Sequence, residues 1–244
     1  MKVKDYLLEK IAAGTIHMTL VDPDKQTPEH AAEIAADAVS LGTDAIMIGG
    51  STDVTQQNLD ETALAIKASV DIPVIYFPSG AHALSAHCDA LYFMSMLNSR
   101  DVRMVIREQA AAGPIVKKLG IEPISMGYII VEPGMKVGEV GKADLVKRDE
   151  PMTAMGYALA AEYLGMDLVY LEAGSGAGAP VPPKMISAVK SVISVPLIVG
   201  GGIRDAAAAS AAKEAGADAV VTGTLVEADG YLKALEAVIK VIKS

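Results

Sequence analysis

The chain of 244 residues has no tryptophan, only two phenylalanines and a single cysteine, Cys88. One cysteine excludes an internal disulfide bond and is typical of proteins in the reducing cytosol. We expect Cys88 to be buried as a small apolar side chain beside a strand. Because aromatic rings are few, aliphatic side chains must build the core, and a chain of this length can bury a large one.

The sequence also lacks any run of lysine or arginine, and its formal net charge is −9. This charge argues against nucleic acid or an anionic membrane surface as a partner. Charged residues and glycines interrupt every apolar stretch before it reaches the roughly 20 residues that a transmembrane helix needs. The N-terminal MKVKDYLLEKIAAG has helical spacing and lacks the cleavage site of a signal peptide. We therefore expect no transmembrane segment and a cytoplasmic protein.

Mean hydropathy is nevertheless high, at +0.34. The surplus of apolar side chains must enter a core, an apolar ligand groove or a subunit interface. We therefore expect a homo-oligomer, with a dimer and a hexamer both open.

Short apolar runs alternate with longer amphipathic segments along the chain. Strands are predicted at 16–21, 45–48, 74–76, 90–94, 124–131, 168–171, 197–199 and 219–222. Helices are predicted at about 28–41, 55–69, 101–119, 152–164, 182–192, 205–215 and 229–242. The recurring LGTDAIMI, LGMDLVYL and AGADAVVT, each joining a helix end to a strand, are typical of a parallel α/β fold. We predict one (β/α)₈ TIM-barrel domain over 1–244, irregular in its third unit, where 77–90 are too short and broken for a full helix.

Two glycine-ended runs near the C-terminus indicate where a ligand binds. VPLIVGGG at 195–202 and ADAVVTGT at 217–224 have the features of the last two strands of such a barrel. Glycines after a strand let backbone N–H groups approach a ligand closely, and in this fold the loops after strands 7 and 8 commonly hold phosphate. The sequence thus predicts a substrate that carries a phosphate group.

Candidate catalytic residues stand at the end of the sixth predicted strand. Tyr170 and Glu172 are two residues apart, so both point into the barrel mouth while Leu171 faces the helices. Glu172 can act as a general base on a hydroxyl, and Tyr170 can position or donate to an oxygen. An ion pair inside the barrel is the alternative role for Glu172, although few basic residues stand at strand ends. The small residues of 173–177 offer backbone N–H groups and the Ser175 hydroxyl to an anion.

Two other strand ends offer oxygen ligands for a metal ion. Asp22, after the first strand, can direct its carboxylate into the mouth, where Mg²⁺ accepts such ligands. Capping of the following turn is the alternative role for Asp22. Ser51, after the second strand, can bind a metal or a phosphate, and turn geometry alone also explains it. No predicted strand contains a lysine, which argues against a Schiff-base aldolase.

Six segments follow one another along the chain: LVDPDK, DAIMIGGS, LYFMSMLNS, YLEAGSGA, VGGGIRD and VTGT. Together they resemble the geranylgeranylglyceryl phosphate synthase family, which includes the bacterial heptaprenylglyceryl phosphate synthases. The similarity covers nearly the whole chain, and YLEAGSGA and DPDK are its specific parts. Bacterial members carry lysine two residues before the aspartate, where this chain has Leu20, so it is placed nearer the archaeal branch.

The resemblance implies a Mg²⁺-dependent prenyltransferase on a modified TIM barrel. It would join the geranylgeranyl group of geranylgeranyl diphosphate to the C3 hydroxyl of sn-glycerol 1-phosphate, the first ether bond of archaeal membrane lipids. Asp22 and Ser51 would hold Mg²⁺ and, through it, the diphosphate. Glu172 would take the hydroxyl proton, with Tyr170 beside it. The residues implied for glycerol phosphate are Tyr170, Leu171, Glu172, Ala173, Gly174, Ser175, Gly176, Gly201, Gly202, Gly223 and Thr224. The prenyl tail would lie between the irregular third unit and the methionine-rich 92–99.

Two alternative functions stay open on the sequence alone. A flavin-dependent barrel would place the phosphate of FMN in the same glycine loops, although the shortage of aromatic residues to stack on a flavin argues against it. A barrel that binds phosphorylated ligands without catalysis would bind them without metal and yield no product.

Overall fold

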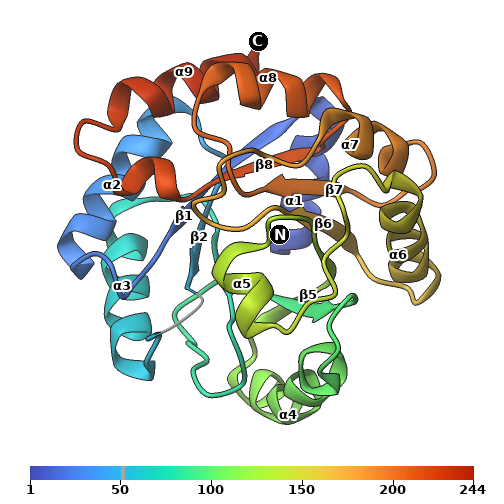
Figure 1. Cartoon of the computed structure of the whole chain (residues 1–244). Coiled ribbons are helices and arrows are strands. Elements are labelled where there is room, and N and C mark those ends of the chain that lie inside the picture. The colour runs from blue at the N-terminus through green and yellow to red at the C-terminus, as the bar shows by residue number, and fades with distance from the viewer. Residues whose placement is uncertain (51–52) are drawn as a thin grey trace.

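Eight parallel strands close into a barrel in the computed structural model, which describes residues 1–50 and 53–244. Each strand pairs with the next along the chain, and β8 pairs with β1 to complete the ring (Figure 1). The strands are β1 Ile16–Val21, β2 Ala45–Gly49, β3 Val74–Phe77, β4 Ala90–Met96, β5 Glu122–Ile130, β6 Leu168–Glu172, β7 Leu197–Gly200 and β8 Ala219–Thr222. The predicted (β/α)₈ TIM barrel is confirmed.

The helices are α1 Val3–Ala13, α2 Pro28–Leu41, α3 Gln56–Ser69, α4 Glu108–Leu119, α5 Met135–Val140, α6 Pro151–Tyr163, α7 Pro183–Lys190, α8 Ala206–Glu214 and α9 Leu232–Lys243. Apart from α1 and α5, which lie at the two ends of the barrel, they surround the strand ring on the outside (Figure 1). Local signals set several of their starts. The Thr27 side chain accepts the backbone N–H of His30, and Pro28 follows at the first helical position. Thr55 and Asn58 form a capping box at the start of α3.

The third and fourth units depart from the regular repeat. Within the described chain no helix lies between β3 and β4, as the broken sequence of 77–90 predicts. The helix predicted at 101–119 is divided into a π-helix, Arg103–Arg107, and α4. The Ser95 hydroxyl donates to the carbonyl oxygen of Val105 at 2.6 Å, which ties the π-helix to β4. The short helix α5 has no counterpart among the predicted elements.

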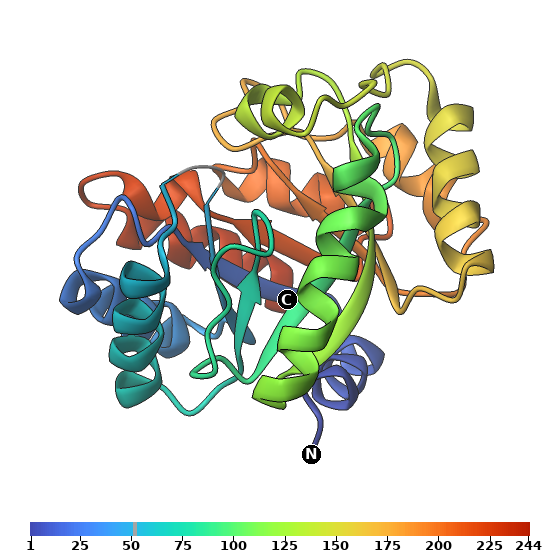
Figure 2. The same cartoon turned by 90° about the horizontal axis from the view of Figure 1, so that it is seen from below.

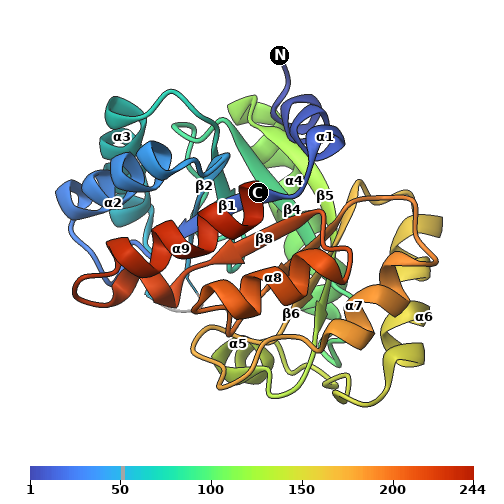
Figure 3. The ribbon, with the colours of Figure 1, turned by 90° about the horizontal axis from the view of Figure 1, so that it is seen from above.

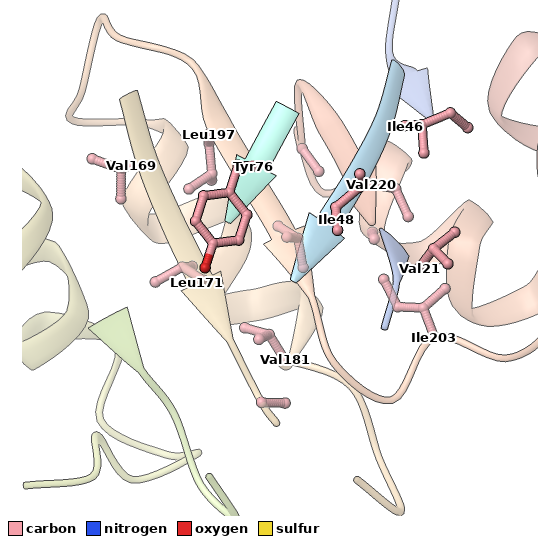
Figure 4. Packing of buried hydrophobic residues seen from close by; sticks show 14 of the residues in the cluster. Val21, Ile46, Ile48, Tyr76, Val169, Leu171, Val181, Leu197, Ile203 and Val220 are labelled. Carbon is pink, nitrogen blue, oxygen red and sulfur yellow. The ribbon is translucent and has the colours of Figure 1, made fainter. Parts of the chain in front are cut away.

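Alternation along the strands divides the core into two layers. On β1, Ile16 and Met18 pack inside the barrel, whereas Val21 packs between the strands and the helices. Figure 4 shows part of this outer layer, with Val21 and Leu171 among its side chains. Cys88 is only 6% exposed in the same layer, so its predicted burial is confirmed.

The N-terminal helix α1 covers the amino ends of the strands. Val3 and Leu7 pack with the inner layer of the barrel. The backbone N–H groups of Val3 and Lys4 donate to the carboxylate of Glu122, at the start of β5, at 2.7 and 3.1 Å. Figure 2 and Figure 3 show α1 and α5 at opposite ends of the barrel, which leaves the carboxyl ends of the strands as the place for a ligand. A search of the described residues finds no helix long and apolar enough to span a membrane.

Candidate active site

Three adjoining cavities lie at the carboxyl ends of the strands. The central cavity is lined by Asp22, Tyr128, Tyr170 and Glu172, and the rest of its wall is mostly apolar. An apolar cavity adjoins it and shares with it Pro78, Ser79, Met94, Met96 and Met104. A glycine-loop cavity shares with the central cavity Leu20, Tyr170, Glu172, Ser175 and Gly223. Glu172 therefore faces both the central and the glycine-loop cavity.

Glu172 ends β6 and is only 7% exposed. Its Oε1 accepts the backbone N–H of Gly174 at 2.6 Å, and the nearby hydroxyls of Tyr170 and Tyr128 favour the charged form of the carboxylate. Burial raises the pKa of Glu172 to about 7, because these three polar groups offset the loss of water only in part. No basic group of the described chain acts on this pKa, so the structure gives no support to an ion pair. A pKa near neutrality suits a general base.

Tyr128 is a site residue that the sequence motifs did not identify. Strand pairing places it opposite Tyr170, with 5.3 Å between the ring centroids, and the ring of Phe77 lies edge-on at the same distance. Burial raises the pKa of both tyrosine hydroxyls, so both stay protonated and can donate to the glutamate. The signal that could have found Tyr128 is its inward position on a predicted strand, shared with Met126 and Ile130.

Asp22 follows β1 and lines the central cavity. Its Oδ2 lies 3.2 Å from Nζ of Lys25, which also pairs with Glu227 at 2.8 Å. Its Oδ1 is buried and has no hydrogen-bond partner in the part of the chain that the structure describes. Gly50 leaves room for this oxygen, since a Cβ there would collide with it. Burial is the main cause that raises the pKa of Asp22 to about 7.

These features of Asp22 fit a divalent cation. A buried carboxylate oxygen without a partner is the hard, anionic ligand that Mg²⁺ prefers. Residues 1–50 and 53–244 contain no group of three or more histidines, cysteines or acidic residues that could hold a metal. A cation at Asp22 would therefore need substrate ligands, as Mg²⁺ commonly takes from phosphates. Ser51, the second predicted ligand, lies outside the described residues.

The loops after β6, β7 and β8 meet around the glycine-loop cavity. Gly201 and Gly202 follow β7 with φ angles of +82° and +73°, a conformation that favours glycine. After β8, Thr224 Oγ1 accepts the backbone N–H of Gly176 at 3.1 Å and lies 2.9 Å from the Ser175 hydroxyl. Predicted glycerol phosphate residues from the ends of three strands thus line one cavity: Tyr170, Glu172, Ser175, Gly201, Gly202, Gly223 and Thr224.

Two residues of the implied glycerol phosphate set point elsewhere. The side chains of Leu171 and Ala173 belong to the outer layer, and Figure 4 labels Leu171 among the side chains of that layer. The backbone N–H of Ala173 is bonded to the carbonyl oxygen of Gly200 at 3.1 Å. Gly174 and Gly223 do lie at the site, the first through its bond to Glu172 and the second in the wall of two cavities.

Fold and site together define a class of protein: a (β/α)₈-barrel enzyme with a buried carboxylate between a glycine-rich cavity and a larger, mostly apolar one. The sequence model of the PcrB family matches residues 7–243, and the chain belongs to this family.

Named relatives agree with the family predicted from the motifs. Geranylgeranylglyceryl phosphate synthase of Methanococcoides burtonii is 52% identical over 246 residues, which cover 100% of both chains. The protein of the same name from Methanosarcina acetivorans is 57% identical over 215 residues, 88% of this chain and 87% of its own. The crystal structure of (S)-3-O-geranylgeranylglyceryl phosphate synthase from Thermoplasma acidophilum, in complex with its substrate sn-glycerol-1-phosphate, matches with a TM-score of 0.97. It is 45% identical and aligns over 100% of this chain and 99% of its own.

Proposed function

We propose that the protein is a Mg²⁺-dependent prenyltransferase that joins the geranylgeranyl group of geranylgeranyl diphosphate to the C3 hydroxyl of sn-glycerol 1-phosphate. The observation that carries the proposal is the position of Glu172, between the glycine-loop cavity and the central cavity. The names of the relatives support the reaction, and the substrate in the Thermoplasma acidophilum structure supports the acceptor.

Glu172 acts as the general base of the transfer. The acceptor oxygen forms a bond to C1 of the prenyl group while the bond from C1 to the diphosphate oxygen breaks. The hydroxyl proton passes to the Glu172 carboxylate, and diphosphate leaves. The hydrogen bond from Gly174 holds the carboxylate in one orientation beside the Tyr170 and Tyr128 hydroxyls, which places it against a bound hydroxyl before the reaction starts.

The acceptor phosphate occupies the glycine-loop cavity. Backbone N–H groups at Gly201, Gly202 and Gly223, with the hydroxyls of Ser175 and Thr224, supply donors from three loops. This arrangement supports the binding of a phosphate next to Glu172, so that the glycerol part of the acceptor lies towards the base.

Asp22 would hold Mg²⁺ through its unpartnered Oδ1, with Ser51 as the second predicted ligand. When bound, Mg²⁺ stabilises the negative charge that develops on the leaving diphosphate. The ammonium group of Lys25, already 3.2 Å from Asp22, adds positive charge at the same place. This cluster lies on the central cavity, which both substrates would share.

The prenyl chain runs from the central cavity into the apolar cavity. Met94, Met96 and Met104 line both, and their flexible side chains adapt to an irregular apolar ligand. Each buried CH₂ contributes about 0.8 kcal/mol, so burial of the geranylgeranyl group can dominate the affinity for the donor. The missing helix between β3 and β4 leaves room for this second cavity.

Product formation from sn-glycerol 1-phosphate and geranylgeranyl diphosphate, with Mg²⁺ and with EDTA, tests the proposal. We expect an ether-linked product that disappears with the chelator. If product forms only with prenyl diphosphates longer than geranylgeranyl diphosphate, the donor is of the heptaprenyl type instead. Bound FMN in the purified protein would favour the flavin-dependent alternative. If the protein binds phosphate but forms no product with any donor, the alternative of a non-catalytic phosphate-binding barrel is supported.

We also propose that one domain carries the whole site and that the protein forms a homo-oligomer. Exposed apolar side chains of the α6 region support association, with Met152, Tyr163 and Leu164 exposed by 72, 80 and 72%. Light scattering of the purified protein separates a dimer from a hexamer, and a monomer would contradict the proposal.

A further inference from the structure

Arg204 stands two residues after the β7 glycines, at the rim of the glycine-loop cavity. We infer that its guanidinium group binds the phosphate of the acceptor substrate and supplies the positive charge of this subsite. The inference rests on the proposed function, because it adds Arg204 to the glycerol phosphate residues that the family resemblance implies.

The structure holds Arg204 against the loop that closes this cavity. Its Nη2 donates to the carbonyl oxygen of Gly176 at 2.7 Å. The N–H of the same glycine donates to Thr224 Oγ1 at 3.1 Å, so Arg204 and Thr224 fix this loop from β7 and β8 respectively. A guanidinium has five N–H donors in a rigid fork, and one bond to a carbonyl leaves the others for a ligand.

The other charges around the cavity show why a cation is needed. Among the described residues that line it, Glu172 is acidic and Arg204 carries the only positive charge. The start of α8 already has an anion, because the Asp205 side chain accepts the N–H of Ala208 at 2.8 Å. Lys25 is engaged by acidic partners on the central cavity. Without Arg204, neutral backbone and hydroxyl donors would have to hold a phosphate dianion in a cavity that Glu172 also lines.

Arg204 adds a positive charge to this cavity and can form charge-assisted hydrogen bonds to a bound phosphate. Hydrogen bonds between guanidinium and phosphate are about twice as strong as neutral ones, and they are frequently bidentate. Arg204 carries no ion pair to an acidic side chain among residues 1–50 and 53–244, so its charge is free for the ligand. Its side chain is exposed, so a substitution there should not disturb the core.

Calorimetric titration without a prenyl donor tests the inference, with sn-glycerol 1-phosphate and inorganic phosphate as the probes. We expect R204Q to weaken glycerol 1-phosphate binding by about 10- to 100-fold. R204K should lose less, because it keeps the charge but not the fork. The matched control is R148Q: Nη1 of Arg148 donates to the carbonyl oxygen of Glu132 at 3.3 Å, away from this cavity. This control should bind as tightly as the wild type.

A second readout separates phosphate binding from a role in holding the loop. The affinity of the wild type should fall as salt rises, and this dependence should be weaker in R204Q. If R204Q and the wild type bind glycerol 1-phosphate with equal affinity, the inference is overturned. It is also overturned if R204Q binds more weakly but with the same salt dependence as the wild type. Neither outcome contradicts the proposed function. If inorganic phosphate binds in a way that depends on Arg204 but glycerol 1-phosphate does not bind, the proposed acceptor is wrong. The role of Arg204 in binding phosphate is then still supported. Binding of neither probe by the wild type overturns both.

Discussion

Replacement of Glu172 by glutamine tests two consequences of burying this carboxyl: its action as a general base and its effect on the stability of the fold. Glutamine has nearly the same size and keeps an oxygen for the N–H of Gly174, but it cannot take a proton from a hydroxyl. We expect E172Q to lower kcat by about 10²- to 10⁴-fold, the usual contribution of a positioned base. In the wild type, kcat should rise with pH through about 7, because the base works when ionised.

The same substitution should stabilise the fold at neutral and alkaline pH. The ordinary pKa of this carboxyl is 4.5, and burial raises it to about 7 in the folded protein. The folded state therefore binds the proton more tightly than the unfolded chain does. The wild type loses stability as pH rises from 4.5 to about 7, and above that range the loss is complete. The difference between these two pKa values corresponds to about 3 kcal/mol in the free energy of unfolding. The glutamine variant does not lose this stability, because glutamine does not ionise.

Urea unfolding near pH 5 and near pH 8, followed by circular dichroism, measures this effect. The free energy of unfolding of E172Q minus that of the wild type should grow by about 2 to 3 kcal/mol between the two conditions. Glu236→Gln, on the exposed face of α9, is the matched control and should show no such change. An equal difference at both pH values would refute the burial argument, and an unchanged kcat would refute the base assignment.

Three further substitutions test the rest of the site. Tyr128→Phe removes a hydroxyl that lowers the pKa of the buried glutamate, so the rise of kcat should shift to higher pH. An unshifted profile would contradict the role of Tyr128 beside the base. Asp22→Asn should lower kcat by about 10²-fold or more while calorimetry shows unchanged glycerol 1-phosphate binding, and loss of that binding would argue against a role confined to the donor. Gly200→Ala adds a Cβ that collides with the Tyr170 hydroxyl and should lower kcat by about 10-fold. Gly113→Ala should keep full activity, because no described atom outside its own helical turn lies within 4 Å of the new Cβ. Equal kcat in both alanine variants would show that the hydroxyl position is not critical.

The barrel could be predicted from the sequence because its signals are local and repeated. Apolar strand runs act over a few residues and recur in every unit, and caps such as Thr27 add local signals at the starts of α2, α3 and α8. The inward direction of Tyr170 and Glu172 also followed from strand alternation alone, and the structure places both in the mouth as predicted.

Features that depend on contacts between distant segments could not be predicted in this way. The π-helix Arg103–Arg107 is tied to β4 by a bond from Ser95, and nothing in its own sequence specifies that contact. Tyr128 gains its place from pairing with Tyr170 on the neighbouring strand. The position of Arg204 depends on a carbonyl oxygen 28 residues away in the chain. Each of these needs the register of the closed barrel before it can be seen.

The helix α1 over the amino ends of the strands bears on the kinetics of turnover. With that end covered, acceptor, donor and the larger lipid product share the passage at the carboxyl ends, beneath α5. A product that fills the cavities blocks both incoming molecules until it departs. We therefore expect product inhibition that is competitive towards each substrate, and a burst of product in the first turnover. Detergent micelles or vesicles, which extract the lipid product, should raise the steady rate without changing the size of that burst.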